Sequence, residues 1–353
     1  MLDKDNIVTD NVFSYMKAVS NKQSTIYDVA KMAGVSSATV SRVLNSPDMV
    51  AKEKREKVQE AINALNFVPK ADAVANARAS YKKIGVVAPF FTQPSFMERL
   101  RGVAQVLTSE HYELVIYSMD TEEDLENYVQ MLVNTRRVDG LIMLCVKPEE
   151  KILTLLREAE FPVCFVECEC EGFDSVLVQN LQGGQLAAEF LFSRGVKRPG
   201  FVGQYSSKEY TVSATEERFR GFSFYFANQG ITIKKEHVWI GDFSEGTLDE
   251  SLEKYLEQKD LPDAVFCSSD VIAARFIRVA QSKGIDVPEK IKVIGFDNID
   301  VSEYLGLTSV SQSLEESGRV AARLVLERIA KKESAVVTAR VPIEVIERET
   351  TGF

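Results

Sequence analysis

The sequence of 353 residues has no long hydrophobic run and no secretory signal. The longest candidates, such as residues 140–146, have the length of a buried strand, whereas a helix that crosses a bilayer needs about 20 residues. The N-terminus shows no basic segment followed by an apolar one, so we expect a cytoplasmic protein without membrane association. A chain of this length exceeds what one hydrophobic core usually supports, which predicts two or three packed units.

Cysteine and histidine are scarce. The chain has five cysteines and two histidines, His111 and His237. An odd and low cysteine count is typical of reduced thiols in a cytoplasm. Cys168 and Cys170 are close enough in sequence for a metal or redox site, but neither histidine is near and no second cysteine pair completes a tetrahedral shell. We therefore interpret them as inert thiols near a strand end, and we expect no metal and no cofactor.

Catalytic motifs are also missing. The sequence has no G-x-x-x-x-G-K-[ST], no G-x-G-x-x-G after the first predicted strand and no G-x-S-x-G. Asp270 and Asp297 follow predicted strands, but no histidine lies near either in sequence. The pair Gly183 and Gly184 opens a helix and is interpreted as a packing contact. The sequence therefore predicts a protein that is not an enzyme.

Positive charge is scarce over the chain as a whole but not everywhere. The 52 acidic residues outnumber the 42 basic ones, which gives a net charge of −10. Residues 24–83 nevertheless hold ten basic and six acidic residues, whereas residues 84–353 carry a net charge of −14. A small basic module is thus joined to a large acidic one. Only the basic module is a candidate for binding nucleic acid.

The basic module shows the pattern of a helix-turn-helix. Apolar residues recur at helical spacing in residues 26–33 and again in residues 40–44. Between them, Gly34 suits a tight turn that needs positive φ, and Ser36 is placed to cap the next helix. A third helix is predicted over residues 52–66. These features predict an all-α DNA-binding domain whose second helix, near residues 37–44, lies in the major groove.

The outward face of that second helix carries the predicted DNA contacts. Arg42 can make a bidentate contact to guanine. The small and polar side chains around it suit phosphates or base edges. They are Ser37, Ala38, Thr39, Ser41 and Asn45. A plain solvated helix face is the alternative, but the turn residues and the charge distribution both favour DNA.

Residues 84–353 alternate short β-rich runs with amphipathic helical segments. The strand-like runs include residues 84–89, 113–118, 140–146, 162–167, 200–203, 264–268 and 292–296. Strands separated by helical crossovers indicate a parallel, doubly wound α/β sheet, and there are too many strands for one small sheet. The sequence therefore predicts two Rossmann-like lobes with a ligand cleft at the carboxyl ends of the strands.

Polar and aromatic residues near these strand ends are candidates for binding a small hydroxylated ligand. Carboxylates and arginine can form paired hydrogen bonds with hydroxyl groups, and a ring can cover an apolar face. The candidates are Phe96, Arg218, Phe243, Asp270 and Asp297. Each also has a structural interpretation, since the rings could belong to the core and the carboxylates could cap helices or turns.

Three segments together resemble a known family. They are TIYDVAKMAGVSSATVSRVLN (25–45), REKVQEAINALNFVP (55–69) and the strand IGVVAP (84–89). The sequence resembles the lactose-repressor family of bacterial transcription regulators from Thr25 to the C-terminus. This resemblance implies an α/β fold of two periplasmic-binding-protein-like lobes with doubly wound parallel sheets, preceded by the helix-turn-helix domain.

The resemblance implies roles on the DNA side. It places Arg42 at the family's guanine contact, and Ser37 and Ala38 where the family sets operator preference. The positions that match family contacts to the DNA backbone are Thr25, Tyr27 and Asn45.

The hinge departs from the family's pattern. Family members wedge a pair of leucines into the minor groove, and each leucine lies seven residues after a proline. Counted from Pro69, that position is Asn76. Asparagine can hydrogen-bond to base edges in the minor groove but is a poor apolar wedge. We therefore expect Asn76 to contact DNA and the operator to be bent less than is usual in the family.

The resemblance also implies effector contacts. It matches Arg218, Asp297 and Phe243 to residues that touch the effector, and Ser95 and Phe96 to the wall of the first lobe. Some usual polar residues are changed, so that two family pairs read Ser269–Asp270 and Gln179–Asn180, and Val146 stands where a polar residue is common. These departures predict a pocket that is less polar than a typical sugar site.

The family's chain tracing implies domain boundaries. Residues 1–23 are an N-terminal extension, either disordered or the result of a misassigned start. The DNA-binding domain is expected at 24–68, the hinge at 69–83 and the effector-binding and dimerisation domain at 84–353. Within the last, lobe 1 is expected at about 84–181 and 311–336, and lobe 2 at about 182–310 and 337–353. The lack of a leucine-heptad tail favours a homodimer, in which two helix-turn-helix domains read a palindrome.

The hypothesis that follows is a transcriptional repressor that binds a palindromic DNA operator and is controlled by a small-molecule effector, a sugar or sugar derivative. One alternative is a regulator controlled by a protein partner. Another is a solute-binding protein related to periplasmic sugar receptors, against which the helix-turn-helix and the missing signal peptide argue.

Overall fold

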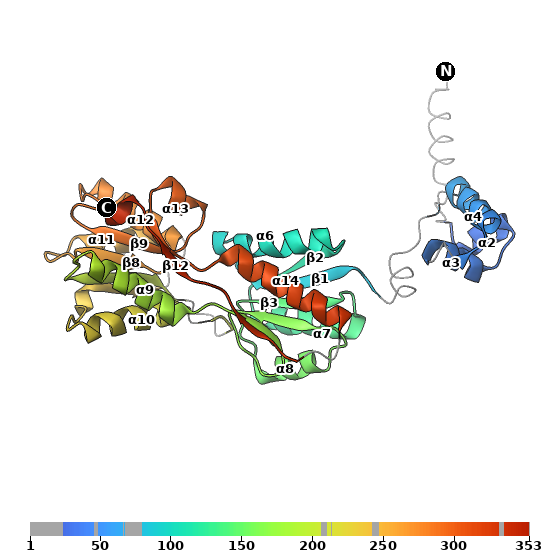
Figure 1. The fold of residues 1–353 in the computed structure, drawn as a ribbon, viewed down its shortest axis with the longest axis horizontal. Helices are drawn as coiled ribbons and strands as arrows, with labels where there is room; N and C mark the ends of the chain where they lie inside the picture. Colours follow the sequence, from blue (N-terminus) through green and yellow to red (C-terminus); the bar gives the residue numbers. More distant parts are fainter. Residues whose placement is uncertain are drawn as a thin grey trace, which may run out of the picture. The chain divides into compact units, whose positions relative to one another are not determined.

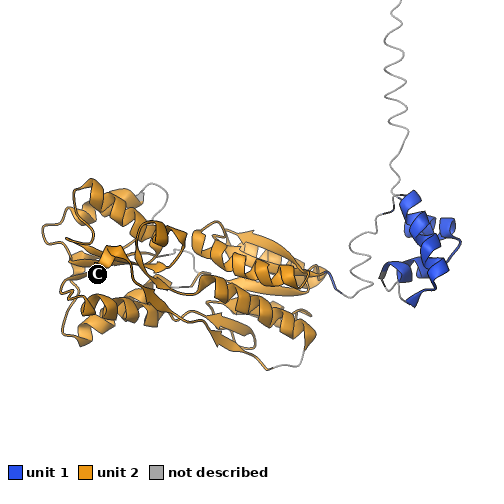
Figure 2. Ribbon diagram, turned by 45° about the horizontal axis from the view of Figure 1, so that its top comes forward, with its two compact units in different colours: residues 1–81 blue, residues 82–353 orange. Residues whose placement is uncertain are grey.

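The computed structural model of the chain describes residues 24–45, 49–65, 67, 80–205, 210–212, 214–241, 247–331 and 335–352. They belong to two compact units, which divide between Tyr81 and Lys82 (Figure 2). Most of the predicted hinge, with Asn76, lies outside the described residues, as do the N-terminal extension and Phe243. None of the helices described is long and apolar enough to cross a membrane.

The first unit contains the predicted helix-turn-helix. Its helices are α2 (Ile26–Ala33), α3 (Ser37–Asn45) and α4 (Lys52–Ala64). Gly34 ends α2 with a φ of 66°, and the backbone N–H of Thr39 donates to Ser36 Oγ at 3.2 Å, so both predicted turn residues are confirmed. The buried core is small and is drawn from all three helices: Val29, Ala30, Ala33, Val40, Val43, Val58 and Ala61.

The second unit has two six-stranded sheets (Figure 1). The first sheet is parallel throughout and follows the order β11-β5-β4-β3-β1-β2. Its strands are β1 (Lys83–Pro89), β2 (Glu113–Met119), β3 (Gly140–Leu144), β4 (Val163–Val166), β5 (Asp174–Leu177) and β11 (Thr338–Arg340). Helices cover both faces: α6 (Pro94–Ser109) and α14 (Leu314–Ala330) on one, α7 (Glu122–Thr135) and α8 (Glu150–Arg157) on the other.

The second sheet repeats this plan in the order β12-β10-β9-β8-β6-β7, with only β12 antiparallel. Its strands are β6 (Pro199–Gln204), β7 (Val238–Gly241), β8 (Ala264–Cys267), β9 (Lys292–Asp297), β10 (Thr308–Ser311) and β12 (Glu344–Ile346). One face packs on α9 (Asn180–Ser193) and α10 (Ala214–Asn228), and the other on α11 (Thr247–Leu256) and α12 (Asp270–Ser282). A short helix, α13 (Asp300–Tyr304), follows β9. The predicted fold class is confirmed.

One predicted lobe boundary is wrong. Residues 337–353 were expected in lobe 2, but β11 pairs with β5 and so completes the first sheet. Only β12 joins the second sheet, where it runs antiparallel to β10. The last crossing between the lobes therefore comes after β11 rather than before it, because each short C-terminal strand is placed by its sheet partner rather than by its neighbour in sequence.

Glycines set the position of two cavity arginines. A Cβ on Gly184 of α9 would lie 1.9 Å from the carbonyl oxygen of Arg218, and a Cβ on Gly318 of α14 would lie 2.0 Å from that of Arg99. Only glycine permits helices to cross this closely. The predicted packing role of Gly184 is thereby confirmed, and in both lobes an arginine sits where two helices touch backbone to backbone.

Candidate functional site

A cavity of about 340 Å³ lies between the two lobes of the second unit. That volume is in the range of small-molecule sites, which is about 300–1,000 Å³. Residues that follow the carboxyl ends of strands in both sheets line it, as expected for open α/β sheets. From lobe 1 these include Phe90, Ser95, Phe96, Arg99, Cys145 and Glu167, and from lobe 2 Thr215, Arg218, Ser268, Ser269 and Asp297.

The backbone around the cavity is strained. Phe90, Cys145, Glu167 and Asp297 stand at the ends of β1, β3, β4 and β9, and their φ angles are 53°, 57°, 65° and 116°. All four side chains line the cavity. Positive φ costs a non-glycine residue about 1–3 kcal/mol and is concentrated at functional sites. This independent observation points to the same place as the cavity.

The wall from lobe 1 contains a buried ion pair. Arg99 of α6 donates from Nη2 to the carboxylate of Glu167, and the two side chains are 2% and 5% exposed. The same Nη2 donates to Oε1 of Gln312 at 3.0 Å. A buried guanidinium needs such a partner, because an uncompensated charge in a protein interior costs several kcal/mol. The charge of Arg99 is therefore compensated within the wall, although its buried Nε has no hydrogen-bond partner among the described residues.

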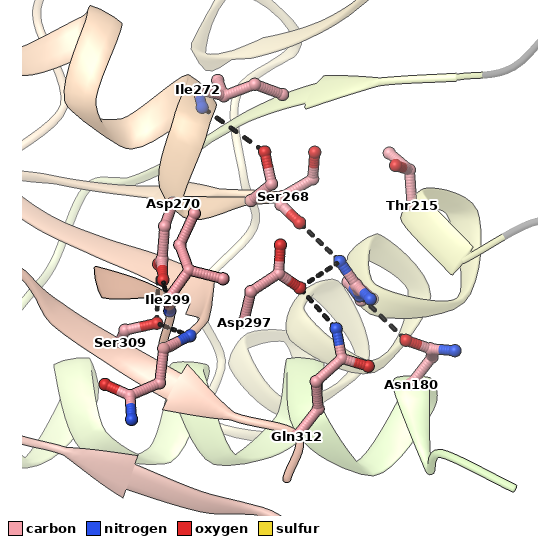
Figure 3. A network of polar contacts seen from close by, with 12 residues as sticks. Asn180, Thr215, Ser268, Asp270, Ile272, Asp297, Ile299, Ser309 and Gln312 are labelled. Carbon is pink, nitrogen blue, oxygen red and sulfur yellow. Dashed lines mark hydrogen bonds and ion pairs between the residues drawn. The ribbon is translucent and has the colours of Figure 1, made fainter. Parts of the chain in front are cut away.

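The wall from lobe 2 holds a second arginine in a different way (Figure 3). Arg218 of α10 donates from Nε to Asn180 Oδ1 at 2.8 Å and from Nη1 to the carbonyl oxygen of Ser268 at 2.6 Å. Its guanidinium also lies over the ring of Phe296, 3.6 Å from the centroid. The Asp297 carboxylate is 3.9 Å away, beyond hydrogen-bond distance. Neutral groups thus orient Arg218, and Asp297 compensates its charge from a distance.

Gln312 joins the two walls. Its Oε1 accepts from Arg99. Its Nε2 donates to Asp297 (Figure 3). It stands on the segment that leaves β10 in lobe 2 and enters α14 in lobe 1. A continuous chain of polar contacts therefore runs across the floor of the cavity from Glu167 to Arg218.

Burial shifts the ionisation of the cavity carboxylates. The pKa of Asp297 is raised to about 6 by burial, against the opposing effect of Arg218 and Arg99. Asp270 accepts from Ser309 Oγ at 2.6 Å and from the Ile299 N–H at 3.0 Å, and it does not line the cavity. Burial, followed by the nearby charge of Asp297, raises the pKa of Asp270 to about 8.

The structure brings together four of the six effector residues expected from the sequence. Ser95, Phe96, Arg218 and Asp297 line the cavity, and Phe96 packs edge-on against Phe90 with ring centroids 6.2 Å apart. Asp270 does not join them, because its side chain turns down into lobe 2 to hold the turn after β9. The sixth, Phe243, lies outside the described residues.

Sequence reasoning missed several polar residues of the cavity, among them Arg99, Glu167 and Gln312. Arg99 follows Phe96 by one helical turn, which was an available signal. Glu167 ends the predicted strand 162–167, and Gln312 lies where the chain crosses between lobes. Because the first two are charged, the wall is more polar than the expected pocket, and Val146 is buried outside the lining.

The predicted DNA-contacting residues lie in the first unit. On α3, Ala38 and Arg42 are exposed, and Ser37, Thr39 and Ser41 are partly exposed. Tyr27 is 72% exposed, and no described residue forms an ion pair with Arg42. Thr25 forms a capping box with Asp28 at the start of α2, which is a structural role beside any contact to DNA. Asn45 ends α3.

Models of two protein families match the chain. The model described as bacterial regulatory proteins, lacI family, matches residues 25–70, and that of a periplasmic binding protein-like domain matches residues 188–351. A curated relative, the HTH-type transcriptional repressor PurR of Photobacterium profundum, is 33% identical over 317 residues. The match covers 88% of this chain and 93% of that protein.

Two solved structures extend the similarity to the fold. A LacI-family transcriptional regulator from Silicibacter pomeroyi is 26% identical with a TM-score of 0.80, covering 94% of this chain and all of that one. A complex of the transcriptional regulator CelR with cellobiose is 26% identical with a TM-score of 0.67, covering 93% of this chain and all of that one. Both matches span the two units.

Proposed function

The chain belongs to the LacI family of bacterial regulatory proteins, and on that premise we propose that a neutral polyhydroxylated molecule, a sugar or sugar derivative, controls its affinity for a palindromic operator. It is a DNA-binding transcriptional repressor with a ligand-binding domain and not an enzyme, as its curated relatives are repressors. The effector occupies the cavity between the lobes. Repression requires access to DNA, so the protein acts in the cytoplasm.

The balance of charge in the cavity carries the effector proposal. Two arginines and two carboxylates of its lining have side chains less than 10% exposed, and a third carboxylate of the lining, Glu216, is exposed to solvent. A hydroxyl group can accept from Arg218 and donate to Asp297 without adding charge. A polyanion would face both carboxylates at close range. Phe96 and Phe90 supply the apolar surface that covers a sugar ring, and the related CelR complex contains cellobiose.

On the DNA side, α3 presents Arg42 to the major groove. Arg42 reads guanine, and Ser37, Ala38, Thr39 and Ser41 read or border the neighbouring bases. Tyr27, Thr25 and Asn45 contact phosphates, and Asn76 contacts the minor groove. One helix-turn-helix binds weakly, so the protein acts as a homodimer on two half-sites.

The test of this proposal is selection of bound DNA from a random pool, followed by operator titration against a panel of sugars. We expect Arg42→Ala to lose sequence preference, about 1–3 kcal/mol per contacted base pair, while keeping its oligomeric state. Lys57→Ala is the matched control, because it removes one positive charge from α4, where Lys57 pairs with Glu53 at 2.8 Å. Sequence-specific footprints with Arg42→Ala would refute the DNA assignment. Operator affinity unchanged by every sugar would refute the effector class.

A further inference from the structure

The loop between β4 and β5 holds two thiols in contact. Sγ of Cys168 lies 3.6 Å from Sγ of Cys170. Cys168 is partly exposed, whereas Cys170 is buried and packs in the core of lobe 1 on the side of α7 and α8. The other three cysteines of the chain, Cys145, Cys164 and Cys267, are all buried. An accessible thiol backed by a second thiol is the arrangement from which a disulfide forms without a partner molecule.

The surroundings make the two thiols unequal. The pKa of the Cys168 thiol is lowered, first by the hydrogen bond from Cys170 and further by the charge of Lys147. That hydrogen bond and burial raise the pKa of Cys170. Burial raises the pKa of Cys145, Cys164 and Cys267 as well. Because the thiolate is the reactive form, Cys168 is the attacking sulfur.

We propose that Cys168 and Cys170 form a reversible dithiol–disulfide site that responds to hydrogen peroxide. The Cys168 thiolate attacks one peroxide oxygen, and the O–O bond breaks. Cys168 becomes a sulfenic acid, and the departing hydroxide becomes water by taking up the proton that the Cys168 thiol had released. The Cys170 sulfur then attacks the Cys168 sulfur, and the hydroxyl group leaves as water with the proton of the Cys170 thiol. Two thiols and one peroxide thus give one disulfide and two waters; sulfur is oxidised and peroxide reduced.

The same loop reaches the cavity. Glu167, the partner of Arg99, directly precedes Cys168 and has a φ of 65°. On the other side, the Glu169 carboxylate accepts from Thr338 Oγ1 of β11 at 3.2 Å. We infer that closing the sulfurs from 3.6 Å to the bonded distance of about 2.05 Å shifts the short loop as well as the two side chains. The oxidised loop therefore displaces Glu167 and loosens its contact with Arg99. This coupling rests on the cavity being the effector site.

Thiol counting on the full-length protein tests the chemistry. After hydrogen peroxide, alkylation under denaturing conditions is expected to find three thiols in place of five, and dithiothreitol is expected to restore five. The tryptic peptide 158–194 also contains Cys164, so fragmentation must place the loss of two hydrogens between Cys168 and Cys170. Five persisting thiols, a link to Cys164 or a disulfide between chains would overturn the proposal.

Variants separate the two roles. Cys170→Ser is expected to leave a sulfenic acid on Cys168 that dimedone traps, and Cys168→Ser is expected to lose thiols at least about tenfold more slowly. Cys164→Ala, which removes a buried thiol of β4, is expected to react as the wild type does. Equal thiol loss in Cys168→Ser and the wild type would refute the assignment of the attacking sulfur.

Hydrogen exchange tests the coupling without any ligand. Oxidation is expected to speed exchange in the first turns of α6, residues 94–101, in the wild type and not in the Cys168→Ser, Cys170→Ser double variant. A change confined to residues 167–173 would refute the link to the cavity and leave the disulfide standing. Failure to select DNA would refute the proposed function and leave both thiol results unaffected.

Discussion

The two lobes bury the same kind of ion pair in the cavity wall and satisfy it in different ways. In lobe 1, Arg99 and Glu167 are directly hydrogen-bonded. In lobe 2, Arg218 and Asp297 are about as deeply buried but stand 3.9 Å apart, and Arg218 bonds to Asn180 and Ser268 instead. A pair in direct contact compensates its own charges, although Arg99 Nε keeps no partner among the described residues, whereas a pair held apart leaves room for a third group. The difference suggests that lobe 1 frames the cavity and lobe 2 recognises the ligand.

The carboxylates differ in their surroundings as well. The charge of Asp297 acts on a second buried carboxylate, Asp270, and the pKa values of Asp297 and Asp270 are raised to about 6 and about 8. The charge of Glu167 also raises the pKa of Asp297, whereas the charges of Arg218 and Arg99 lower it. The ionisation of Asp297 therefore depends on its surroundings, and a ligand hydroxyl that donates to Asp297 would stabilise its ionised form.

The largest expected effect comes from opening the pair in lobe 1. Glu167→Gln leaves the buried Arg99 guanidinium without its hydrogen-bonded counter-charge, and we expect it to lower the free energy of unfolding by about 3 kcal/mol. Urea-induced unfolding measures this loss.

The double variant Arg99→Met, Glu167→Met is the control for that prediction. It removes both charges and keeps most of the side-chain volume, so most of the lost stability should return. If Glu167→Gln unfolds at the urea concentration of the wild type, the pair is not a structural element of lobe 1, and the contrast between the lobes disappears.

Changing the arginine of lobe 2 should act on binding more than on folding. Arg218→Lys keeps the charge but loses the guanidinium fork that bonds Asn180 and Ser268, so effector affinity should fall by about 2 kcal/mol, roughly 30-fold. Calorimetry with the sugar selected from the panel measures it. The matched control is Arg220→Lys on the same helix, where the exposed Arg220 pairs with Glu217 at 2.7 Å. Equal affinity in Arg218→Lys and the wild type would remove Arg218 from the site.

Local signals in the sequence were sufficient to predict the helices and the turn of the first unit. A glycine with positive φ and a serine cap set the turn, and α3 runs from Ser37 to Asn45 where residues 37–44 were predicted. Position near a predicted strand end was sufficient to predict that Arg218 and Asp297 line the cavity. The same rule failed for Asp270, because position after a strand does not determine whether a side chain points up into the cavity or down into the lobe.

The remaining features of the site and the sheets depend on packing between residues that are far apart in sequence. Arg99 meets Glu167 only because α6 and the end of β4 converge in the folded lobe, across 68 residues of sequence. Gln312 bonds Arg99 across 213 residues. Likewise, β11 is three residues long and gains its place from pairing with β5. Propensity and spacing within the sequence contain no information about such meetings.

The smallest expected effect concerns the buried carboxylate of Asp270. The pKa of Asp270 is about 8 in the folded protein, above its ordinary value of about 3.9, so the folded state holds this proton more tightly than the unfolded state. Stability from Asp270 is therefore lost as the pH rises from about 4 through about 8. Asp270→Asn keeps an acceptor for the Ile299 N–H and places an amide N–H at Ser309 Oγ, which then accepts where it donated before, and it has no proton to lose. Between pH 7 and 8 the wild type should lose about 1 kcal/mol that Asp270→Asn keeps, as measured by urea unfolding at each pH. The exposed Asp260→Asn should show the wild-type slope; parallel slopes for Asp270→Asn and the wild type would mean that Asp270 is already ionised and that the lobes do not differ in this respect.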